Sequence, residues 1–133
     1  NFQYMKIQSL KSKKNIKNFL MDQKYVSGLG NIYVNEILFL SSINPRKLIF
    51  KLNKIEILRI LKNTKKILND SIIQGGSSIK DFKGISGKEG YFQQSFKVYN
   101  RHKMGCMKKT CKGIIKKIYI GNRSTFFCKK CQK

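Results

Sequence analysis

Four cysteines are the residues of this chain whose types and spacing most clearly suggest chemistry. Cys106 and Cys111 are separated by four residues, Cys128 and Cys131 by two, and sixteen residues lie between the two pairs. Closely spaced pairs on either side of a hairpin allow four thiolates to converge tetrahedrally on one zinc ion. Because the protein then fills all four coordination positions, we predict one structural Zn²⁺ and no catalytic metal.

Other states of the cysteines remain open at this point. Two disulfides, four reduced thiols without a ligand and an iron–sulfur centre are the alternatives. A strongly basic chain whose cysteines occupy one short segment favours metal over a disulfide framework. His102 lies four residues before Cys106 and would be a fifth ligand, so we predict that it is a surface residue.

The two cysteine pairs need a rigid element between them, and the sequence provides one. Residues 114–120 and 123–127 are rich in branched and aromatic side chains and predict two strands around a Gly121–Asn122 turn. Arg123 directly follows the turn. An arginine at the tip of a metal-held hairpin can enter a groove or bind a phosphate with two hydrogen bonds. The alternative is an ordinary solvated turn arginine.

A second motif, Gly-Leu-Gly-Asn at residues 28–31, stands immediately before a predicted helix. Gly28 and Gly30 permit positive φ and close approach of the backbone to another molecule. Asn31 is placed to cap the helix, and the N–H groups at a helix N-terminus bind phosphate. Two interpretations remain equal here: a clamp for a nucleic-acid backbone, and glycines required only for the packing of two helices.

Helical periodicity dominates the residues before these strands. We predict helices over residues 4–14, 15–24, 31–42 and 53–74, the third ended by Pro45. In the longest helix the expected buried face carries Ile57, Leu61, Leu68 and Ile72.

The chain divides into two predicted units, residues 1–97 and residues 98–133. The first unit ends in a loop at about residues 75–97 that carries five glycines, and a loop of this length is usually either functional or disordered. Its aromatic residues Tyr91, Phe92 and Phe96 indicate that the end of the loop is anchored.

Charge is the strongest compositional signal. The 133 residues carry 29 Lys and Arg against 6 Asp and Glu, for a net charge of +23. Such a chain repels itself unless it binds an anion, and nucleic acid is the commonest anionic partner. An AT-rich genome explains part of the lysine excess but not the scarcity of acids. No apolar run is long enough for a membrane span and no signal peptide is visible, so we expect a cytoplasmic protein. We also expect a monomer.

The few acids do not assemble into a catalytic site. No two carboxylates form an acid/base pair, and no Ser–His–Asp or Cys–His arrangement is present. Glu36 lies in the third predicted helix, where it either is buried against the glycine turn or orders a basic neighbour.

Taken together, these motifs resemble a known family. FLMDQKYVSGLGNIYVNEILFLSSINP resembles the helix–two-turn–helix segment of bacterial formamidopyrimidine-DNA glycosylases. QGGSSIKDF, GKEGYFQQSFKVYNR and RSTFFCKKCQK resemble the later segments of the same family, through to its zinc finger. The resemblance runs in order over nearly the whole chain. It implies a mainly α helix–two-turn–helix domain followed by a small β-hairpin zinc ribbon.

The resemblance also implies a function. Enzymes of this family flip an oxidised purine, such as 8-oxoguanine or a formamidopyrimidine, out of double-stranded DNA and attack the sugar with an amine. They then nick the strand at the abasic site. The family's phosphate contacts fall on Asn31 and Arg123. Its lid over the extruded base falls on residues 77–91, and the lid residues implied are Ser77, Ser78, Lys88, Glu89, Gly90 and Tyr91.

The chain departs from the family in one large respect. The family's nucleophile is an N-terminal proline followed by a glutamate, on a separate β-sandwich domain, whereas this sequence begins Asn1-Phe2. The resemblance therefore implies a C-terminal half that binds damaged DNA and is inactive as a glycosylase by itself. The alternative is a stand-alone zinc-ribbon module that binds nucleic acid, including RNA, without catalysis.

Overall fold

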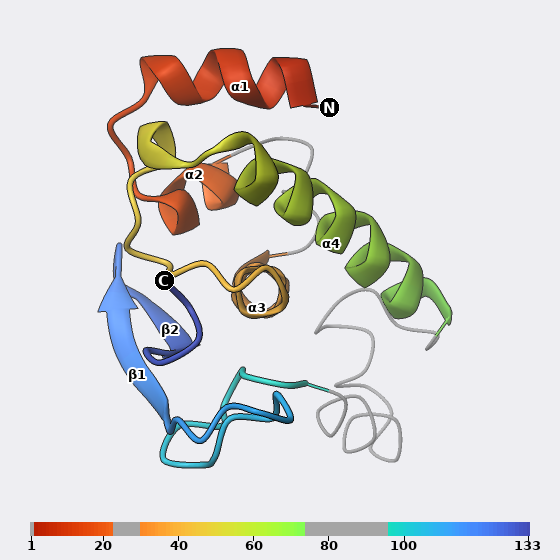
Figure 1. Cartoon of the computed structure of the whole chain (residues 1–133), viewed down its shortest axis with the longest axis vertical. Helices are drawn as coiled ribbons and strands as arrows, with labels where there is room; N and C mark the ends of the chain where they lie inside the picture. Colours follow the sequence, from red (N-terminus) through yellow and green to blue (C-terminus); the bar gives the residue numbers. More distant parts are fainter. Residues whose placement is uncertain (1, 23–29, 74–95) are drawn as a thin grey trace.

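Seven elements succeed one another in the computed structural model, which describes residues 2–22, 30–73 and 96–133 (Figure 1). They are α1 (Phe2–Lys11), α2 (Ile16–Asp22), α3 (Gly30–Leu40), the 3-10 helix η2 (Ile49–Lys51), α4 (Lys54–Ile73), β1 (Ile115–Ile120) and β2 (Arg123–Cys128). The predicted order of four helices and a C-terminal hairpin is confirmed. The single turn η2 was not predicted, because three residues are too few to show a period.

The helix α3 forms the centre of the molecule. Figure 1 shows it end-on, with α2 and α4 on one side and the hairpin on the other. All eight residues from Ile32 to Phe39 are buried, including the polar Asn35 and Glu36. A helix that is buried all round must have its polar side chains satisfied by neighbouring elements, and these two residues contact the second half of the chain.

Local sequence signals explain where the helices begin. Asn15 precedes α2, and its side-chain oxygen accepts a hydrogen bond from the Asn18 amide at 2.8 Å, as an N-cap does. At the start of α4, the Glu56 amide donates to the Asn53 side chain at 2.8 Å, and the Asn53 amide donates to the Glu56 carboxylate at 3.0 Å. This reciprocal pair is a capping box. The Lys47 ammonium binds the same carboxylate at 2.7 Å.

The predicted buried face of α4 is only half correct. Ile57 is fully buried and Leu61 packs against the helical core, but Leu68 is 37% exposed. The side chain of Ile72 lies outside the described residues. The second half of α4 extends beyond the other described elements (Figure 1), so periodic apolar residues there have less to pack against.

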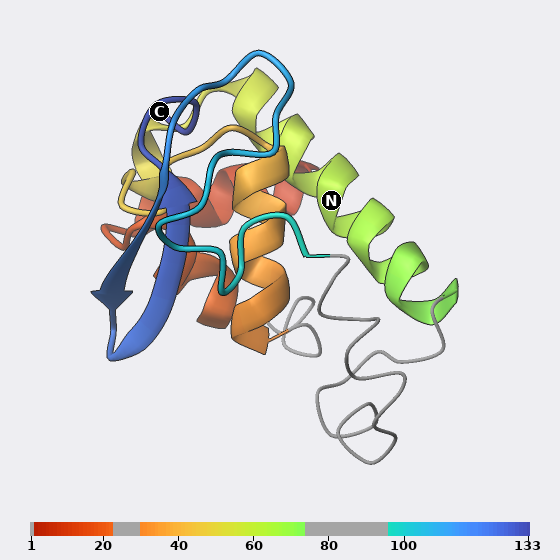
Figure 2. The ribbon, with the colours of Figure 1, turned by 90° about the horizontal axis from the view of Figure 1, so that it is seen from below.

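The hairpin has a separate small core that rests on α3. β1 and β2 pair antiparallel from Ile115 opposite Cys128 to Ile120 opposite Arg123. The two-residue turn has positive φ at Gly121 and Asn122 (57° and 64°), which is a type I′ geometry. Figure 2 shows the hairpin alongside α3. The apolar residues of this core are Val98, Ile115 and Phe126, together with Phe39 from α3.

Candidate metal centre and nucleic-acid interface

The four predicted cysteine ligands converge. Their sulfur atoms all lie within 4.8 Å of one another, with 3.8 Å between Cys106 and Cys131 and 3.5 Å between Cys111 and Cys128. Zn–S bonds of ~2.3 Å at tetrahedral angles require sulfur atoms about 3.8 Å apart. The four thiols therefore fit a single zinc ion, as predicted. All four positions belong to protein, so the site is structural.

Backbone contacts hold the two cysteine pairs in place. The Cys106 amide donates to the Gly113 carbonyl at 2.8 Å, which sets the first pair beside the start of the hairpin. A Cβ on Gly113 would lie 2.6 Å from the Cys128 sulfur and 3.4 Å from the Cys111 sulfur. Only glycine leaves room there for the sulfur atoms. In the second pair, the Cys128 amide donates to the Gln132 side chain at 2.8 Å, and the turn after β2 is thereby closed.

His102 is exposed, as predicted for a surface residue. The centroid of its ring lies 5.5 Å from that of the Phe126 ring. In the described part of the chain, the group that could hold a metal consists of the four cysteines without this histidine.

The second candidate site lies where α3 begins. Gly30 has φ +69°, which an L side chain rarely adopts, and among the described residues no atom outside its own turn of helix lies within 4 Å of the position of a Cβ there. Gly30 is thus required by its backbone conformation. Gly28 lies outside the described residues.

Asn31 does not have the predicted capping role. α3 already begins at Gly30, so Asn31 belongs to its first turn. Its Nδ2 donates to the Ser124 carbonyl at 2.9 Å. That leaves the second hydrogen of the amide nitrogen for a further acceptor. Oδ1 is buried and has no partner among the described residues.

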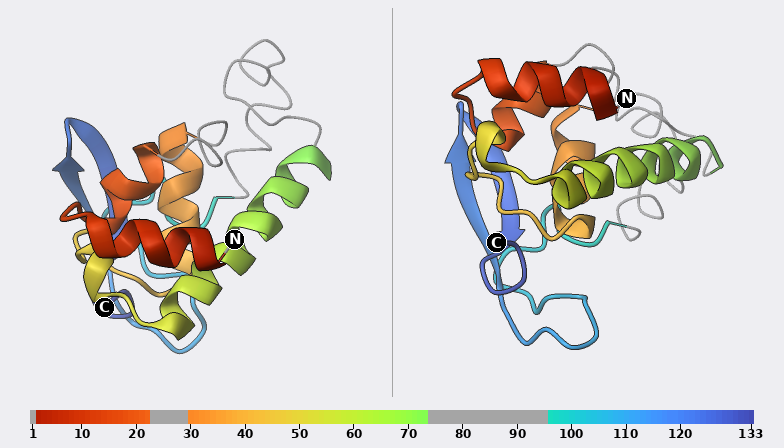
Figure 3. Two further views of the ribbon diagram at one scale, coloured as in Figure 1. Left: turned by 90° about the horizontal axis from the view of Figure 1, so that it is seen from above. Right: turned by 45° about the horizontal axis from the view of Figure 1, so that its top comes forward.

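Arg123 lies beside Asn31 in this arrangement, because it precedes Ser124 on β2. Its side chain is exposed and forms no ion pair with the described residues. Figure 3 shows the hairpin against α2 and α3, and the turn lies at the same end as the start of α3 in Figure 2. The structure thus brings together two residues that are 92 positions apart in the sequence (123 − 31). An exposed arginine that adjoins the residue bound by Asn31, in the first turn of a helix, is suited to binding a phosphate together with that amide.

Two residues that sequence reasoning missed fix this arrangement. The side-chain oxygen Oδ1 of Asn35 accepts a hydrogen bond from the backbone N–H of Phe126 at 2.7 Å, which ties α3 to the backbone of β2. Lys17 on α2 is fully buried, and its Nζ donates to Thr125 Oγ1 at 2.7 Å and to the Ser124 carbonyl at 3.4 Å. An amide inside an apolar helix was a usable signal for Asn35. Lys17 had none, since it is one of 29 basic residues.

Glu36 has a defined structural role. Its carboxylate is 3% exposed and accepts three consecutive backbone N–H groups, from Lys97 at 2.7 Å, Val98 at 2.9 Å and Tyr99 at 2.8 Å. Burial raises the pKa of this carboxyl, and the three backbone hydrogen bonds oppose that rise. Glu36 is buried, but the groups that its carboxylate binds are the N–H groups of residues 97–99; the glycine turn against which burial was expected lies mostly outside the described residues. What it orders is a backbone segment, not a basic side chain.

The predicted anchor Phe96 is buried and its ring contacts Tyr33 edge-on, with centroids 6.3 Å apart. Glu36 and Phe96 together fix the chain where the described residues resume. Tyr91 and Phe92 lie outside them. So do the implied lid residues, which are Ser77, Ser78, Lys88, Glu89, Gly90 and Tyr91.

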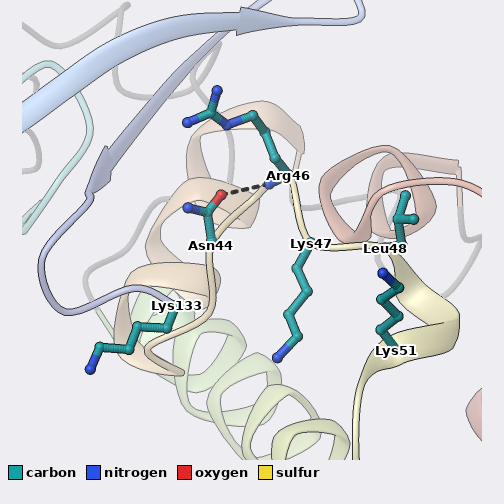
Figure 4. Close-up of a pocket in the computed structure, with 6 residues that line it drawn as sticks. All are labelled: Asn44, Arg46, Lys47, Leu48, Lys51 and Lys133. Carbon is teal, nitrogen blue, oxygen red and sulfur yellow. Dashed lines mark hydrogen bonds between the residues drawn. The ribbon is translucent and has the colours of Figure 1, made fainter.

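Positive charge is not confined to the start of α3. A depression of about 350 Å³ is lined by Asn44, Arg46, Lys47, Leu48, Lys51 and Lys133 (Figure 4). It follows the C-terminal end of α3 and therefore lies away from Asn31. The Arg46 amide binds Asn44 Oδ1 at 2.9 Å, and Lys47 is paired with Glu56. Charge alone therefore does not locate a candidate nucleic-acid site; the hydrogen bond that joins Asn31 to the residue next to Arg123 is a more specific feature.

Comparisons with known proteins agree with this architecture. The family model for the formamidopyrimidine-DNA glycosylase H2TH domain matches residues 1–83, and a model for the zinc finger found in FPG and IleRS matches residues 109–133. The finger model leaves out Cys106, which the structure places with the other three cysteines.

Several relatives and solved structures are similar over the full chain. The formamidopyrimidine-DNA glycosylase of Pseudoalteromonas atlantica is 42% identical over 135 residues, covering 100% of this chain and 49% of that protein. The Haemophilus influenzae enzyme is 41% identical, covering 100% and 48%. Among solved structures, MutM in complex with DNA containing carbocyclic 8-oxo-G superposes with a TM-score of 0.83 at 34% identity, covering 100% of this chain and 46% of that one.

A second solved structure is the Lactococcus lactis enzyme bound to DNA containing an AP site. It has a TM-score of 0.83 at 33% identity and also covers 100% of this chain and 46% of that one. The chain thus spans about half the length of the curated relatives it matches.

A helix–two-turn–helix domain joined to a four-cysteine zinc ribbon defines the class of protein to which this chain belongs. More specifically, the chain belongs to the formamidopyrimidine-DNA glycosylase H2TH-domain family. None of the described helices combines the length and apolar character that a membrane span requires.

Proposed function

We propose that this chain is the DNA-holding half of a base-excision repair enzyme. It binds double-stranded DNA that contains oxidised purines, such as 8-oxoguanine and formamidopyrimidines, or abasic sites. The single observation that carries the proposal is the hydrogen bond from Asn31, in the first turn of α3, to the carbonyl of Ser124, which places the exposed neighbouring residue Arg123 next to the start of α3. Similar solved structures support the choice of ligand, since those proteins are bound to DNA with an 8-oxo-G, an AP site or a Fapy-dG.

The two predicted units have different parts in this function. Residues 1–97 supply the α3 N-terminus and, at residues 77–91, the segment that would cover the extruded base. Residues 98–133 supply Arg123, held by the zinc ribbon. The protein acts as a cytoplasmic monomer on one duplex, which light scattering of the protein–DNA complex would check.

Binding measurements test the phosphate site directly. Arg123→Ala and Asn31→Ala should each weaken binding to a duplex with a tetrahydrofuran abasic analogue and reduce the salt slope by about one contact. Lys65→Ala is the matched control, because Lys65 is an exposed cation on α4. Unchanged binding in both site variants would contradict the assignment, as would a loss of equal size in the control.

Glycosylase catalysis of the kind that the resemblance implies requires an amine nucleophile in addition to a DNA-binding site. We propose that these 133 residues do not carry out glycosylase turnover by themselves, since the described residues present no amine nucleophile beside an acid/base pair. Borohydride trapping on a duplex with 8-oxoguanine should then give no covalent adduct; an adduct would overturn the proposal. Competition with single-stranded RNA covers the alternative: preference for RNA over the abasic duplex would indicate a nucleic-acid-binding module of another kind.

A further inference from the structure

Lys17 is the most unusual ionisable residue in the described part of the chain. It is the largest by volume of the fully buried residues in the described structure. Isolated buried ammonium groups are unfavourable unless paired with a carboxylate. Lys17 has no such partner among the described residues. Its Nζ instead donates to two neutral oxygens, Thr125 Oγ1 at 2.7 Å and the Ser124 carbonyl at 3.4 Å.

These two acceptors connect Lys17 to the proposed phosphate site. Thr125 Oγ1 in turn donates to the Arg123 carbonyl at 3.1 Å. The Ser124 carbonyl also accepts the amide of Asn31 at 2.9 Å. Lys17 is therefore connected to both residues proposed to bind phosphate. Thr125 links it to Arg123, and the Ser124 carbonyl links it to Asn31. Lys17 is a positioning residue for the site.

The charges that face Lys17 have one sign. From α3, the neutral amides of Asn31 and Asn35 approach the same carbonyl. From β2, the neighbouring charged group is Arg123, whose positive charge acts with burial, the larger cause, to lower the pKa of Lys17 to about 8. On α2 itself, Asp22 is paired with Lys14. A cation thus lies under the site with no anion to balance it in the described structure.

We propose that Lys17 is the internal half of the phosphate site: it holds the start of β2 in place, and binding of a DNA phosphate draws a proton from solvent onto its amine. The proposal rests on the proposed function, because it requires a phosphate at Asn31 and Arg123. The phosphate supplies the missing negative charge and offsets the repulsion between Lys17 and Arg123. The ammonium form is then favoured in the complex.

Proton uptake gives the proposal a measurable size. At pH 8 the free protein holds about half a proton on an amine of pKa about 8, so binding should take up about 0.5 proton. If the amine stays protonated in the complex, the affinity at pH 9 should be about tenfold lower than at pH 7. A lysine with an ordinary pKa would give a nearly flat profile over this range.

The experiment uses the zinc-loaded chain and the abasic-analogue duplex. Affinity is measured by fluorescence anisotropy at pH 7, 8 and 9. Calorimetry at pH 8 in buffers of different ionisation enthalpy gives the number of protons taken up by the wild type. Lys17→Met removes the titrating group, and Lys65→Met is the control on an exposed part of α4. The wild-type calorimetry requires no variant to fold.

The outcomes separate the inference from the proposed function. Uptake of about 0.5 proton in the wild type, lost in Lys17→Met and kept in Lys65→Met, supports the inference. Binding that depends on Arg123 but has a flat pH profile and no proton uptake overturns the inference and leaves the function standing. Proton uptake that persists in Lys17→Met also overturns it. Binding that is insensitive to both Arg123→Ala and Asn31→Ala at pH 7 means that the proposed phosphate site, on which the inference rests, has failed.

Discussion

Replacing the buried Lys17 with methionine should make the protein more stable. Methionine has a similar length and no charge, so it keeps the buried volume while removing an ammonium that lacks a carboxylate partner. The change in pKa gives the size of the effect. Burial, with a contribution from Arg123, lowers the pKa of Lys17 from 10.5 to about 8, and each pKa unit corresponds to about 1.4 kcal/mol.

Two opposing free energies determine the stability change in Lys17→Met: the cost of the buried charge, which is removed, and the hydrogen bond to Thr125, which is lost. The charged form of Lys17 lowers the free energy of unfolding by roughly 3 kcal/mol at pH 7. Methionine removes that penalty but leaves Thr125 Oγ1 without its donor, which costs about 1 kcal/mol. The net gain at pH 7 is therefore about 2 kcal/mol, or a rise in Tm of about 8 °C for a domain of this size.

The sign of the pH dependence provides a second check. The folded-state pKa lies below the unfolded one, so the unfolded chain binds more protons between pH 8 and pH 10.5. Wild-type stability should therefore rise with pH, by about 1.3 kcal/mol from pH 7 to pH 9. Lys17→Met lacks this contribution, so the difference between the two proteins should shrink over the same interval.

The free energy of unfolding and the Tm of both proteins would be measured at pH 7 and pH 9 with saturating zinc. Thermal and urea unfolding would be monitored by circular dichroism. Lys65→Met, on the exposed part of α4, should change stability little at either pH. A Lys17→Met protein that is less stable than wild type at pH 7 and keeps the wild-type pH dependence would refute the reasoning. The hydrogen bonds of Lys17, and not its desolvation, would then dominate.

Two further predictions concern other parts of the molecule. Zinc chelation should remove the circular-dichroism signal of the hairpin while most of the helical signal remains. The four sulfur atoms hold the ribbon, whereas the main core lies among the helices. Loss of the whole helical signal at the same chelator concentration would contradict this prediction. Glu36→Gln should lower the free energy of unfolding by about 1–3 kcal/mol. The two oxygens of the carboxylate accept three backbone N–H groups, whereas a side-chain amide has only one acceptor oxygen. Asp70→Asn, in an exposed pair with Lys66, is the control and should have almost no effect in the same unfolding experiment.

Much of the fold could be predicted because its signals are local. The Gly121–Asn122 turn between two branched, aromatic runs specifies the hairpin, and cysteine spacing specifies the metal centre. The face of α4 was predicted less well. Leu68 has the same periodicity as Ile57 but is exposed, because a period shows which side of a helix is apolar and not how far its neighbours extend.

The candidate site was predicted in part. Its exposed members, Asn31 and Arg123, stand next to turns that are visible in the sequence. The side chains that connect them could not be predicted, since the hydrogen bonds of Lys17 to β2 join residues 107 and 108 positions apart. The predicted cap at Asn31 was wrong for the same reason. A local partner was assumed, whereas the amide contacts Ser124 in the other half of the chain.

The long-range ties between the helices and β2 also have a consequence for the order of folding. Contacts within α1 to α4 are relatively local and can form early, whereas those of Lys17, Asn31 and Asn35 to β2 close loops of 89 to 108 residues. During synthesis, residues 123–128 leave the ribosome long after α2 and α3. The geometry of Arg123 is therefore completed in one of the last folding steps, so a nascent chain already has its helical framework before it acquires the proposed grip on phosphate.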